Sequence, residues 1–370
     1  MTRSEQKPKE EKAFLGAVIA LLVFGLVMIS SAGIIYSTTR FGDSYWFFKH
    51  QLVFGVLPGL AAMWLMARID YRIWKKFAVP IFMLMIVLLL LVFVPGVGSR
   101  VYGASRWLQL GSFSFQPSEM AKLSVILYVS AWLSSRTSRQ VADFLEGLVP
   151  FLGIVGVVGL LVLKQPDTGT FGVIALSAFA IFFVAGARFS HIAGILAGGV
   201  ALLGLLVAME PYRLNRLLAF LNPAGDPQGI GYQVTQALLA VGSGGFWGNG
   251  LGHSRQKFNY LPEPVTDSIF AVISEELGFV GAFLLVGLFV FIAMRGLRIA
   301  KNAPDEFGRY VAVGVTAWIV LQAFVNIGAN VALIPLTGIP LPFVSYGGTS
   351  LLFLLASVGI LLSISRRSGA

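Results

Sequence analysis

Residues 267–294 read DSIFAVISEELGFVGAFLLVGLFVFIAM, and none of residues 277–294 carries a charge. A helix needs about 20 apolar residues to cross the hydrocarbon core of a bilayer, because each residue adds about 1.5 Å. Charged residues flank the stretch, with Asp267 at its start and Arg295 directly after its end. The stretch therefore predicts a helix that spans a membrane.

Apolar stretches of similar length recur along the whole chain. Of its 370 residues, 56% are hydrophobic and 12% are charged, whereas a soluble chain has about 25% charged residues. The mean hydropathy is +0.82. The sequence predicts about ten spans, at residues 14–35, 47–67, 77–95, 117–134, 147–164, 168–186, 190–208, 267–294, 309–330 and 345–364. The expected fold class is an all-α polytopic membrane protein.

Lysine and arginine predict the orientation of these spans, because short cytoplasmic loops carry an excess of both. With the N-terminus inside, the short inner loops are consistently basic, and ten spans return the C-terminus to the same side. We expect a single membrane domain over residues 14–366, between cytoplasmic tails at 1–13 and 367–370. Residues 209–266 would form a large extracytoplasmic loop between the seventh and eighth helices.

The charge balance and the absence of cysteine exclude several classes of protein. The net charge is +10, but the basic residues sit at the ends of apolar runs. They therefore indicate contacts with anionic lipid and not with nucleic acid. Disulfides, thiolate metal sites and cysteine nucleophiles are excluded. The three histidines lie far apart without zinc-ligand spacing, so no protein-built metal site is expected.

Charged residues near the outer ends of the spans are the candidates for chemistry, because a charge at membrane depth is costly. Glu119 and Lys122 are three residues apart, so they share a helix face and can pair. A structural ion pair and a role with substrate are equally compatible with this spacing. Lys164 and Asp167 lie in a tight turn between two spans.

Asp267 is the sharpest single candidate, because it places one carboxylate at the outer mouth of the bundle. Its position at a helix start is compatible with an N-cap and with a catalytic role, and a cap would also hold the carboxylate rigidly. Glu275 lies about 12 Å deeper along the same helix, too far to share that chemistry. We expect Glu275 and Glu276 to be structural groups with partners.

Two local patterns resemble known signatures without matching them. Asp167-Thr168-Gly169-Thr170 looks like half of an aspartic-protease site, but such enzymes need two carboxylates and no second copy exists. The glycine-rich run 242–252 matches neither the dinucleotide-binding nor the P-loop pattern. It is expected to form a close-packed outer loop.

A series of short motifs follows in order along the outer segments. They are Gly103-Ala-Ser-Arg-Trp-Leu108, Gln116-Pro-Ser-Glu-Met-Ala-Lys122, Gln165-Pro-Asp-Thr-Gly169, Gly231-Tyr-Gln233, Gly242-Ser-Gly-Gly245, Tyr260-Leu-Pro-Glu263, Thr266-Asp267, Ile269-Phe-Ala271, Glu275-Glu-Leu-Gly278 and Pro340-Leu-Pro-Phe-Val-Ser-Tyr-Gly-Gly348. Together they resemble the SEDS family (shape, elongation, division and sporulation proteins). Residues 210–213, 220–223 and 250–257 are more similar to its division branch than to its elongation branch. Thr168 and Ser268 depart from the common pattern, and neither removes a charged position.

The resemblance implies a peptidoglycan glycosyltransferase that polymerises lipid II on the outer face of the bacterial plasma (inner) membrane. It implies that Asp267 is catalytic, and that Glu119, Lys122 and Asp167 belong to the substrate cavity. Gln116 and Ser345, from the matching motifs, are expected to bind substrate as well. It further implies a class B penicillin-binding transpeptidase as partner and, for the division branch, other division proteins at the septum.

The residues are compatible with that chemistry. Arg106, Lys164, Arg213 and Arg216, together with Lys122, could supply cations for the pyrophosphate of lipid II. Asp267 could act as general base on the acceptor hydroxyl, and a single displacement with inversion needs no second carboxylate. A divalent cation, Mg²⁺ or Mn²⁺, could also help to neutralise the pyrophosphate.

The charges by themselves leave other functions open. A flippase or transporter of lipid II would also carry charged groups within the membrane, although here they gather at one face. A scaffold that recruits a partner enzyme through its helices, and an elongation-type polymerase of the same family, are the remaining alternatives.

Overall fold

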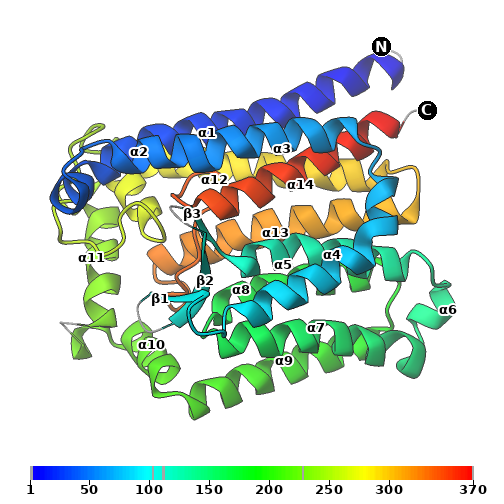
Figure 1. The fold of residues 1–370 in the computed structure, drawn as a ribbon. Coiled ribbons are helices and arrows are strands. Elements are labelled where there is room, and N and C mark those ends of the chain that lie inside the picture. The colour runs from blue at the N-terminus through cyan, green and yellow to red at the C-terminus, as the bar shows by residue number, and fades with distance from the viewer. Residues whose placement is uncertain (1–2, 102–103, 111–112, 227–228, 369–370) are drawn as a thin grey trace.

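The computed structural model describes residues 3–101, 104–110, 113–226 and 229–368. They form a bundle of long helices that run roughly side by side, with both termini at the same end (Figure 1). The long helices are α1 (Arg3–Phe41), α3 (Leu57–Arg68), α4 (Arg72–Leu91), α5 (Pro117–Leu133), α7 (Val149–Lys164), α8 (Thr168–Val184), α9 (Phe189–Met209), α12 (Ile269–Lys301), α13 (Glu306–Asn330) and α14 (Gly348–Arg367). The short helix α2 (Trp46–Gln51) continues through a π-helical turn, η1 (Leu52–Val56), into α3.

Most of the expected spans are confirmed. Within the described ranges, eight helical stretches are long and apolar enough to cross a membrane. They coincide with eight of the expected spans. The other two expected spans, 117–134 and 168–186, correspond to α5 and α8, which are helical over 17 residues each. That these shorter helices also cross the membrane stays a prediction.

The end opposite the termini carries the shorter elements (Figure 1). The strands β1 (Gly98–Val101), β2 (Ala104–Leu110) and β3 (Phe113–Phe115) form an antiparallel sheet in that order. Leu108 is paired with Gly98 on one side and with Phe115 on the other. This sheet is a departure from an all-helical chain, and it lies between the expected spans 77–95 and 117–134.

About half of the expected long loop 209–266 is helical. It contains α10 (Pro211–Leu221), the 3₁₀ turn η3 (Pro223–Gly225) and α11 (Ile230–Ser243). At the opposite end of the bundle lie the short helix α6 (Ser138–Val141) and the π-helical turn η2 (Phe144–Leu148).

Helix α13 lies in the middle of the bundle and contacts α5, α8, α12 and α14. Its Trp318 and Ile319 are completely buried. By contrast, only 6% of the apolar stretch of α9 is buried inside the protein, and α9 packs chiefly against α10. Lipid tails are as apolar as these side chains, so such exposure carries no penalty in a bilayer.

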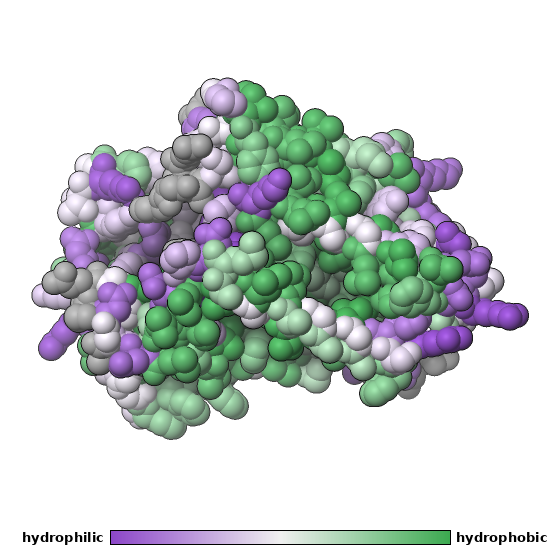
Figure 2. Space-filling view, turned by 90° about the horizontal axis from the view of Figure 1, so that it is seen from below, coloured by the Kyte–Doolittle hydropathy of each residue, from purple (hydrophilic) through white to green (hydrophobic). Residues whose placement is uncertain are grey.

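Hydrophobic and hydrophilic side chains are distributed over the surface as in a membrane protein. Figure 2 shows hydrophobic side chains over the middle of one face, with hydrophilic side chains gathered toward both ends. Large apolar residues such as Leu160 and Val200 are 65% and 72% exposed. The protein is therefore a polytopic membrane protein.

Candidate active site

A groove of about 1050 Å³ opens at the end of the bundle that carries the sheet. One wall is apolar and comes from the last turns of α7 and α9, with Leu160, Leu163, Leu202, Leu206 and Met209. The other wall is polar and comes from β2, α10, α11 and the segment before α12. Because Leu160 and Met209 are 65% and 68% exposed on the outside of the bundle, the apolar wall faces the zone of lipid tails.

Of the five basic residues expected to bind the pyrophosphate, all but Lys122 line the groove: Arg106, Lys164, Arg213 and Arg216. Arg106 donates from Nε to the carbonyl oxygen of Gln165 at 2.9 Å, and it also contacts the carbonyl of Pro166. Arg216 donates to the carbonyl of Leu336 at 3.0 Å. A carbonyl orients a guanidinium without cancelling its charge, so these contacts favour an anionic ligand.

Arg213 shows how the local fold aims such a side chain. It lies in the first turn of α10, two residues after Pro211, which occupies the position where proline suits a helix start. Its Nε donates to the hydroxyl of Thr168 at 3.2 Å, and its Nη1 donates to the carbonyl of Leu206 at 3.1 Å. The Arg213 side chain therefore joins α10 to the outer ends of α8 and α9.

Asp267 lines the groove and is partly buried. Its Oδ1 accepts from the hydroxyl of Thr266 at 3.3 Å, and the same hydroxyl lies 2.9 Å from Oε2 of Glu263. Burial, helped by the negative charge of Glu263, raises the pKa of Asp267 to about 6, although Thr266 and Arg216 oppose the shift. A carboxylate with such a pKa is a better proton acceptor than an ordinary aspartate and is still ionised at neutral pH.

The N-cap interpretation of Asp267 is wrong. Helix α12 begins at Ile269, its N-cap residue is Ser268, and no side chain caps it. Asp267 therefore precedes the cap, and its carboxylate lies on the wall of the groove. Gly338 passes close by, since a Cβ at that residue would lie 3.8 Å from Oδ2 of Asp267.

The backbone of Asp267 is held by α13. The side-chain amides of Asn326 and Asn330 both donate to the carbonyl oxygen of Asp267, each at 2.8 Å. Asn326 also donates to the carbonyl of Ile339 at 2.8 Å. Through these bonds, helix α13 anchors both Asp267 and the neighbouring loop 331–347.

The two asparagines continue a row of buried polar side chains on α13. The row consists of Trp318, Gln322, Asn326 and Asn330, at every fourth position and therefore on one face. Trp318 donates to Oε1 of Gln322 at 2.7 Å, and Gln322 donates to the carbonyl of Pro340 at 2.9 Å. We call this row the α13 ladder. It connects the interior of the bundle to the loop beside Asp267.

The ion pair expected between Glu119 and Lys122 lies at the inner end of the α13 ladder. Their nitrogen and oxygen are 2.8 Å apart, and the two side chains are 3% and 1% exposed. Lys122 also donates to Oε1 of Gln322 at 2.9 Å. Of the two roles compatible with the spacing, the geometry favours a structural ion pair.

Several residues expected to bind substrate are behind the groove wall. In the described part of the chain, the lining of the groove does not include Glu119, Lys122, Gln116, Asp167 or Ser345. Asp167 caps α8 by accepting from the amide of Thr170 at 3.2 Å. Gln116 donates to the Asp167 carboxylate at 3.4 Å, and Ser345 donates to the carbonyl of Thr266. These residues support the wall, because their polar atoms are directed to the protein.

Other lining residues have no role in the sequence-based prediction. Glu210, Gln233 and Glu263 all line the groove. Glu263 lies within a quoted motif, but only the fold places its carboxylate beside Asp267. The α13 ladder could have been recognised in the sequence, because its polar side chains recur at every fourth position of an apolar helix.

The fold and the groove define a polytopic membrane protein with one charged, lipid-facing groove at the end of its helical bundle. The family model FTSW_RODA_SPOVE, described as "Cell cycle protein", matches residues 12–369. The chain belongs to this family, which confirms the resemblance identified from the motifs.

Curated relatives match along nearly their whole length. Stage V sporulation protein E of Bacillus subtilis (strain 168) is 45% identical over 352 residues, 95% of this chain and 95% of that protein. A protein named "Probable peptidoglycan glycosyltransferase FtsW" from Geobacter sp. (strain M18) is 42% identical over 351 residues, 94% of this chain and 95% of that protein.

Solved structures share the fold. A chain from the structure described as "Structural coordination of polymerization and crosslinking by a peptidoglycan synthase complex" has a TM-score of 0.77 at 29% identity, covering 96% of this chain and 97% of that chain. The rod shape determining protein RodA of Thermus thermophilus has a TM-score of 0.70 at 28% identity, covering 97% of each chain.

The buried ion pair supports a prediction about stability. Lys122→Met leaves Glu119 as an uncompensated buried charge, which costs roughly 3–5 kcal/mol. The double variant E119Q/K122M removes both charges and should melt at a higher temperature than K122M. Thermal unfolding of the purified protein in detergent measures both. If K122M melts like the wild type, the structural interpretation of this pair is wrong.

Proposed function

We propose that this chain is a peptidoglycan glycosyltransferase that polymerises lipid II on the outer face of the plasma membrane, with Asp267 as its general base. The observation that carries the proposal is that Asp267 lines the same groove as four basic side chains and an apolar wall. A relative that shares 42% sequence identity with this chain is named a probable peptidoglycan glycosyltransferase, which supports the same activity for this chain.

The groove offers each part of lipid II a matching surface. The undecaprenyl tail fits the apolar wall of α7 and α9, which faces the lipid tails. The pyrophosphate fits among Arg106, Lys164, Arg213 and Arg216, since guanidinium and ammonium groups bind phosphate oxygens strongly. The sugar would then lie beside Asp267, with Glu263 and Gln233 within the same lining.

One displacement accounts for the reaction. Asp267 takes the proton from the 4-hydroxyl of the acceptor sugar, and that oxygen attacks the anomeric carbon of the donor. The bond from this carbon to the pyrophosphate breaks, and undecaprenyl pyrophosphate leaves with the electron pair. The α-linked donor becomes a β-linked glycan by inversion, so one base is sufficient. The cations of the groove stabilise the charge on the leaving group.

A divalent cation on the pyrophosphate remains part of the proposal. The described residues contain no group of three or more histidine, aspartate or glutamate side chains that could hold a metal ion. Mg²⁺ commonly binds substrate phosphates with one or two carboxylates and keeps several waters. Here the ion would be held mainly by the pyrophosphate and by water, which leaves Asp267 free as the base, and it would supply charge neutralisation.

We further propose a class B penicillin-binding transpeptidase as the partner, and septal wall synthesis with other division proteins as the setting. The relatives named FtsW and the solved relative from a peptidoglycan synthase complex support this assignment. A fluorescent fusion distinguishes the branches of the family, because a division enzyme gathers at the septum and an elongation enzyme along the lateral wall.

The general-base role predicts a large loss of activity in Asp267→Asn. The amide cannot accept the proton, so lipid II polymerisation should fall on the order of 10²-fold or more. Gel analysis of glycan products, with the transpeptidase partner present, measures the rate. Asp43→Asn, which removes an exposed acid paired with Lys49, is the matched control and should keep full activity. Full polymerisation by Asp267→Asn would remove the residue from the mechanism.

The raised pKa of Asp267 predicts the pH dependence. The active base is the ionised form, so kcat/KM should fall as the pH drops through about 6 and should level off about one pH unit above that value. Glu263→Gln removes a negative neighbour that raises this pKa, so the acid limb should move to lower pH. Polymerisation rates between pH 5 and 8 test both statements, and an unmoved limb in Glu263→Gln would contradict the coupling.

A further inference from the structure

Helix α12 is interrupted close to its outer end. Gly278 has φ 65° and ψ −166°, which no α-helix contains. The backbone groups released there pair with the segment 244–250. The amides of Asn249 and Gly250 donate to the carbonyls of Glu275 and Glu276 at 3.0 and 2.9 Å, and the amide of Phe279 donates to the carbonyl of Gly245 at 2.9 Å. The outer part of α12, residues 269–277, is thus a separate helical rod.

Glycine permits this close approach. A Cβ at Gly244 would lie 2.0 Å from the carbonyl oxygen of Ser274, and a Cβ at Gly248 would lie 2.2 Å from that of Glu276. The glycine-rich run therefore packs directly against the interrupted helix, as the sequence predicts for a close-packed loop.

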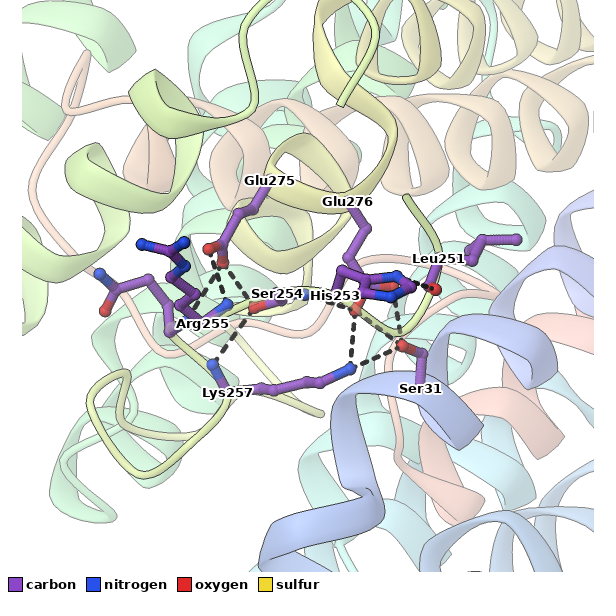
Figure 3. A network of polar contacts seen from close by, with 9 residues as sticks. Ser31, Leu251, His253, Ser254, Arg255, Lys257, Glu275 and Glu276 are labelled. Atoms are coloured by element: carbon purple, nitrogen blue, oxygen red, sulfur yellow. Dashed lines mark hydrogen bonds and ion pairs between the residues drawn. The ribbon is translucent and has the colours of Figure 1, made fainter. Parts of the chain in front are cut away.

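Two adjacent carboxylates at the interruption capture the chain that follows this run (Figure 3). Glu275 accepts from the amide of Arg255 at 2.8 Å, from the amide of Gln256 at 3.3 Å and from the hydroxyl of Ser254. The side chain of Glu275 is 1% exposed. It therefore replaces water as the acceptor for three donors of one turn.

The second carboxylate makes a buried link to α1. Lys257 lies 2.9 Å from Oε1 of Glu276, and the two side chains are 3% and 0% exposed. Ser31 of α1 donates to Glu276 at 2.7 Å and accepts from Lys257 at 3.2 Å. Figure 3 shows Lys257 reaching between Glu276 and Ser31. We call Ser31, Lys257, Glu275 and Glu276 the α12 clamp.

The segment held by this clamp ends at Asp267. After Lys257 the chain makes tight turns, with the amide of Leu261 donating to the carbonyl of Gln256 at 2.9 Å. Its far end is held by the amide of Tyr346, which donates to the carbonyl of Val265 at 2.8 Å. The α12 clamp therefore holds the start of this connection, and loop 331–347 holds its end. The connection carries Glu263 and Asp267.

The burial of three charged groups, on Lys257, Glu275 and Glu276, does not by itself mean that the α12 clamp stabilises the fold. Replacing a buried ion pair by neutral groups of similar size is often neutral or stabilising, because the charges lose their hydration. Buried polar networks can instead select one conformation. A base that must meet an acceptor hydroxyl within hydrogen-bond reach requires such a single conformation.

We propose that Lys257, Glu275 and Glu276 are positioning residues, which lock residues 254–267 between α1 and the outer rod of α12 and so hold Asp267 at the groove. The inference rests on the glycosyltransferase activity proposed above. It assigns a role in catalysis to charged groups that do not line the groove, and it requires no contact between them and lipid II.

The first experiment separates kcat from KM in the double variant K257M/E276Q, assayed as the full chain with its transpeptidase partner. A shift of about 1 Å in a catalytic group can cost about 100-fold in rate. We expect kcat to fall about 10- to 100-fold while KM for lipid II stays within about twofold. The control is E306Q/R309M, which neutralises an exposed pair at the other end of the bundle and should leave both constants unchanged.

The outcomes are distinct. Wild-type kcat in a folded K257M/E276Q overturns the positioning role, whereas an inactive wild type overturns the proposed function instead. If the double variant loses its cooperative melting transition, Glu276→Asp replaces it, since it keeps the charge and shortens the side chain. An unchanged kcat in Glu276→Asp, at an unchanged melting temperature, overturns the proposal.

The second experiment reads the conformation without any assay of activity. The chain has no cysteine, so T39C/Y260C carries spin labels only on α1 and on the clamped segment. We expect a narrow distance distribution in this background and a broadened or shifted one when K257M/E276Q is added. An unchanged distribution would show that the segment holds its place without the clamp, and would overturn the proposal.

Discussion

The two hydrogen bonds from Asn326 and Asn330 to the carbonyl oxygen of Asp267 connect helix α13, in the middle of the bundle, to the residue whose carboxylate lines the groove. A buried carbonyl without a donor costs about 1–3 kcal/mol, so this peptide has little freedom to leave α13. The same helix supports loop 331–347 through Gln322 and Asn326. The rigidity of the bundle is thereby transferred to a residue that lies outside its helices.

The groove combines an acid with a raised pKa and a set of cations, and the two features depend on each other. Arg216 lowers the pKa of Asp267, while burial and Glu263 raise it more strongly. A phosphate group bound among the cations would screen Arg216 and raise the proton affinity of Asp267 further. In the proposed mechanism, binding of the anionic part of the substrate would thus make Asp267 a stronger proton acceptor.

The helices were predictable because lipid imposes one requirement, a run of apolar residues with internal hydrogen bonds, that can be read locally. The cations of the groove were also predictable, since charges near a span end are few. The sheet at 98–115 was not, because three short strands have no strong periodicity. Spacing along one helix does not show whether a polar side chain is directed to the protein interior or to the groove. The roles of five residues depend on that direction: Glu119, Lys122, Asp167, Gln116 and Ser345.

The amino-acid sequence by itself determined the class of the protein, its family and the choice of Asp267 as the candidate base, because hydropathy and ordered motifs are properties of the chain. Only the tertiary structure decided that Glu263 adjoins Asp267 and that α13 holds the carbonyl of Asp267. It also decided that Ser31 meets Lys257 across 226 residues of chain and Glu276 across 245. Such contacts arise when helices pack and exclude water, because most buried donors and acceptors are then paired within the protein. Which partner is available depends on the arrangement of the whole bundle.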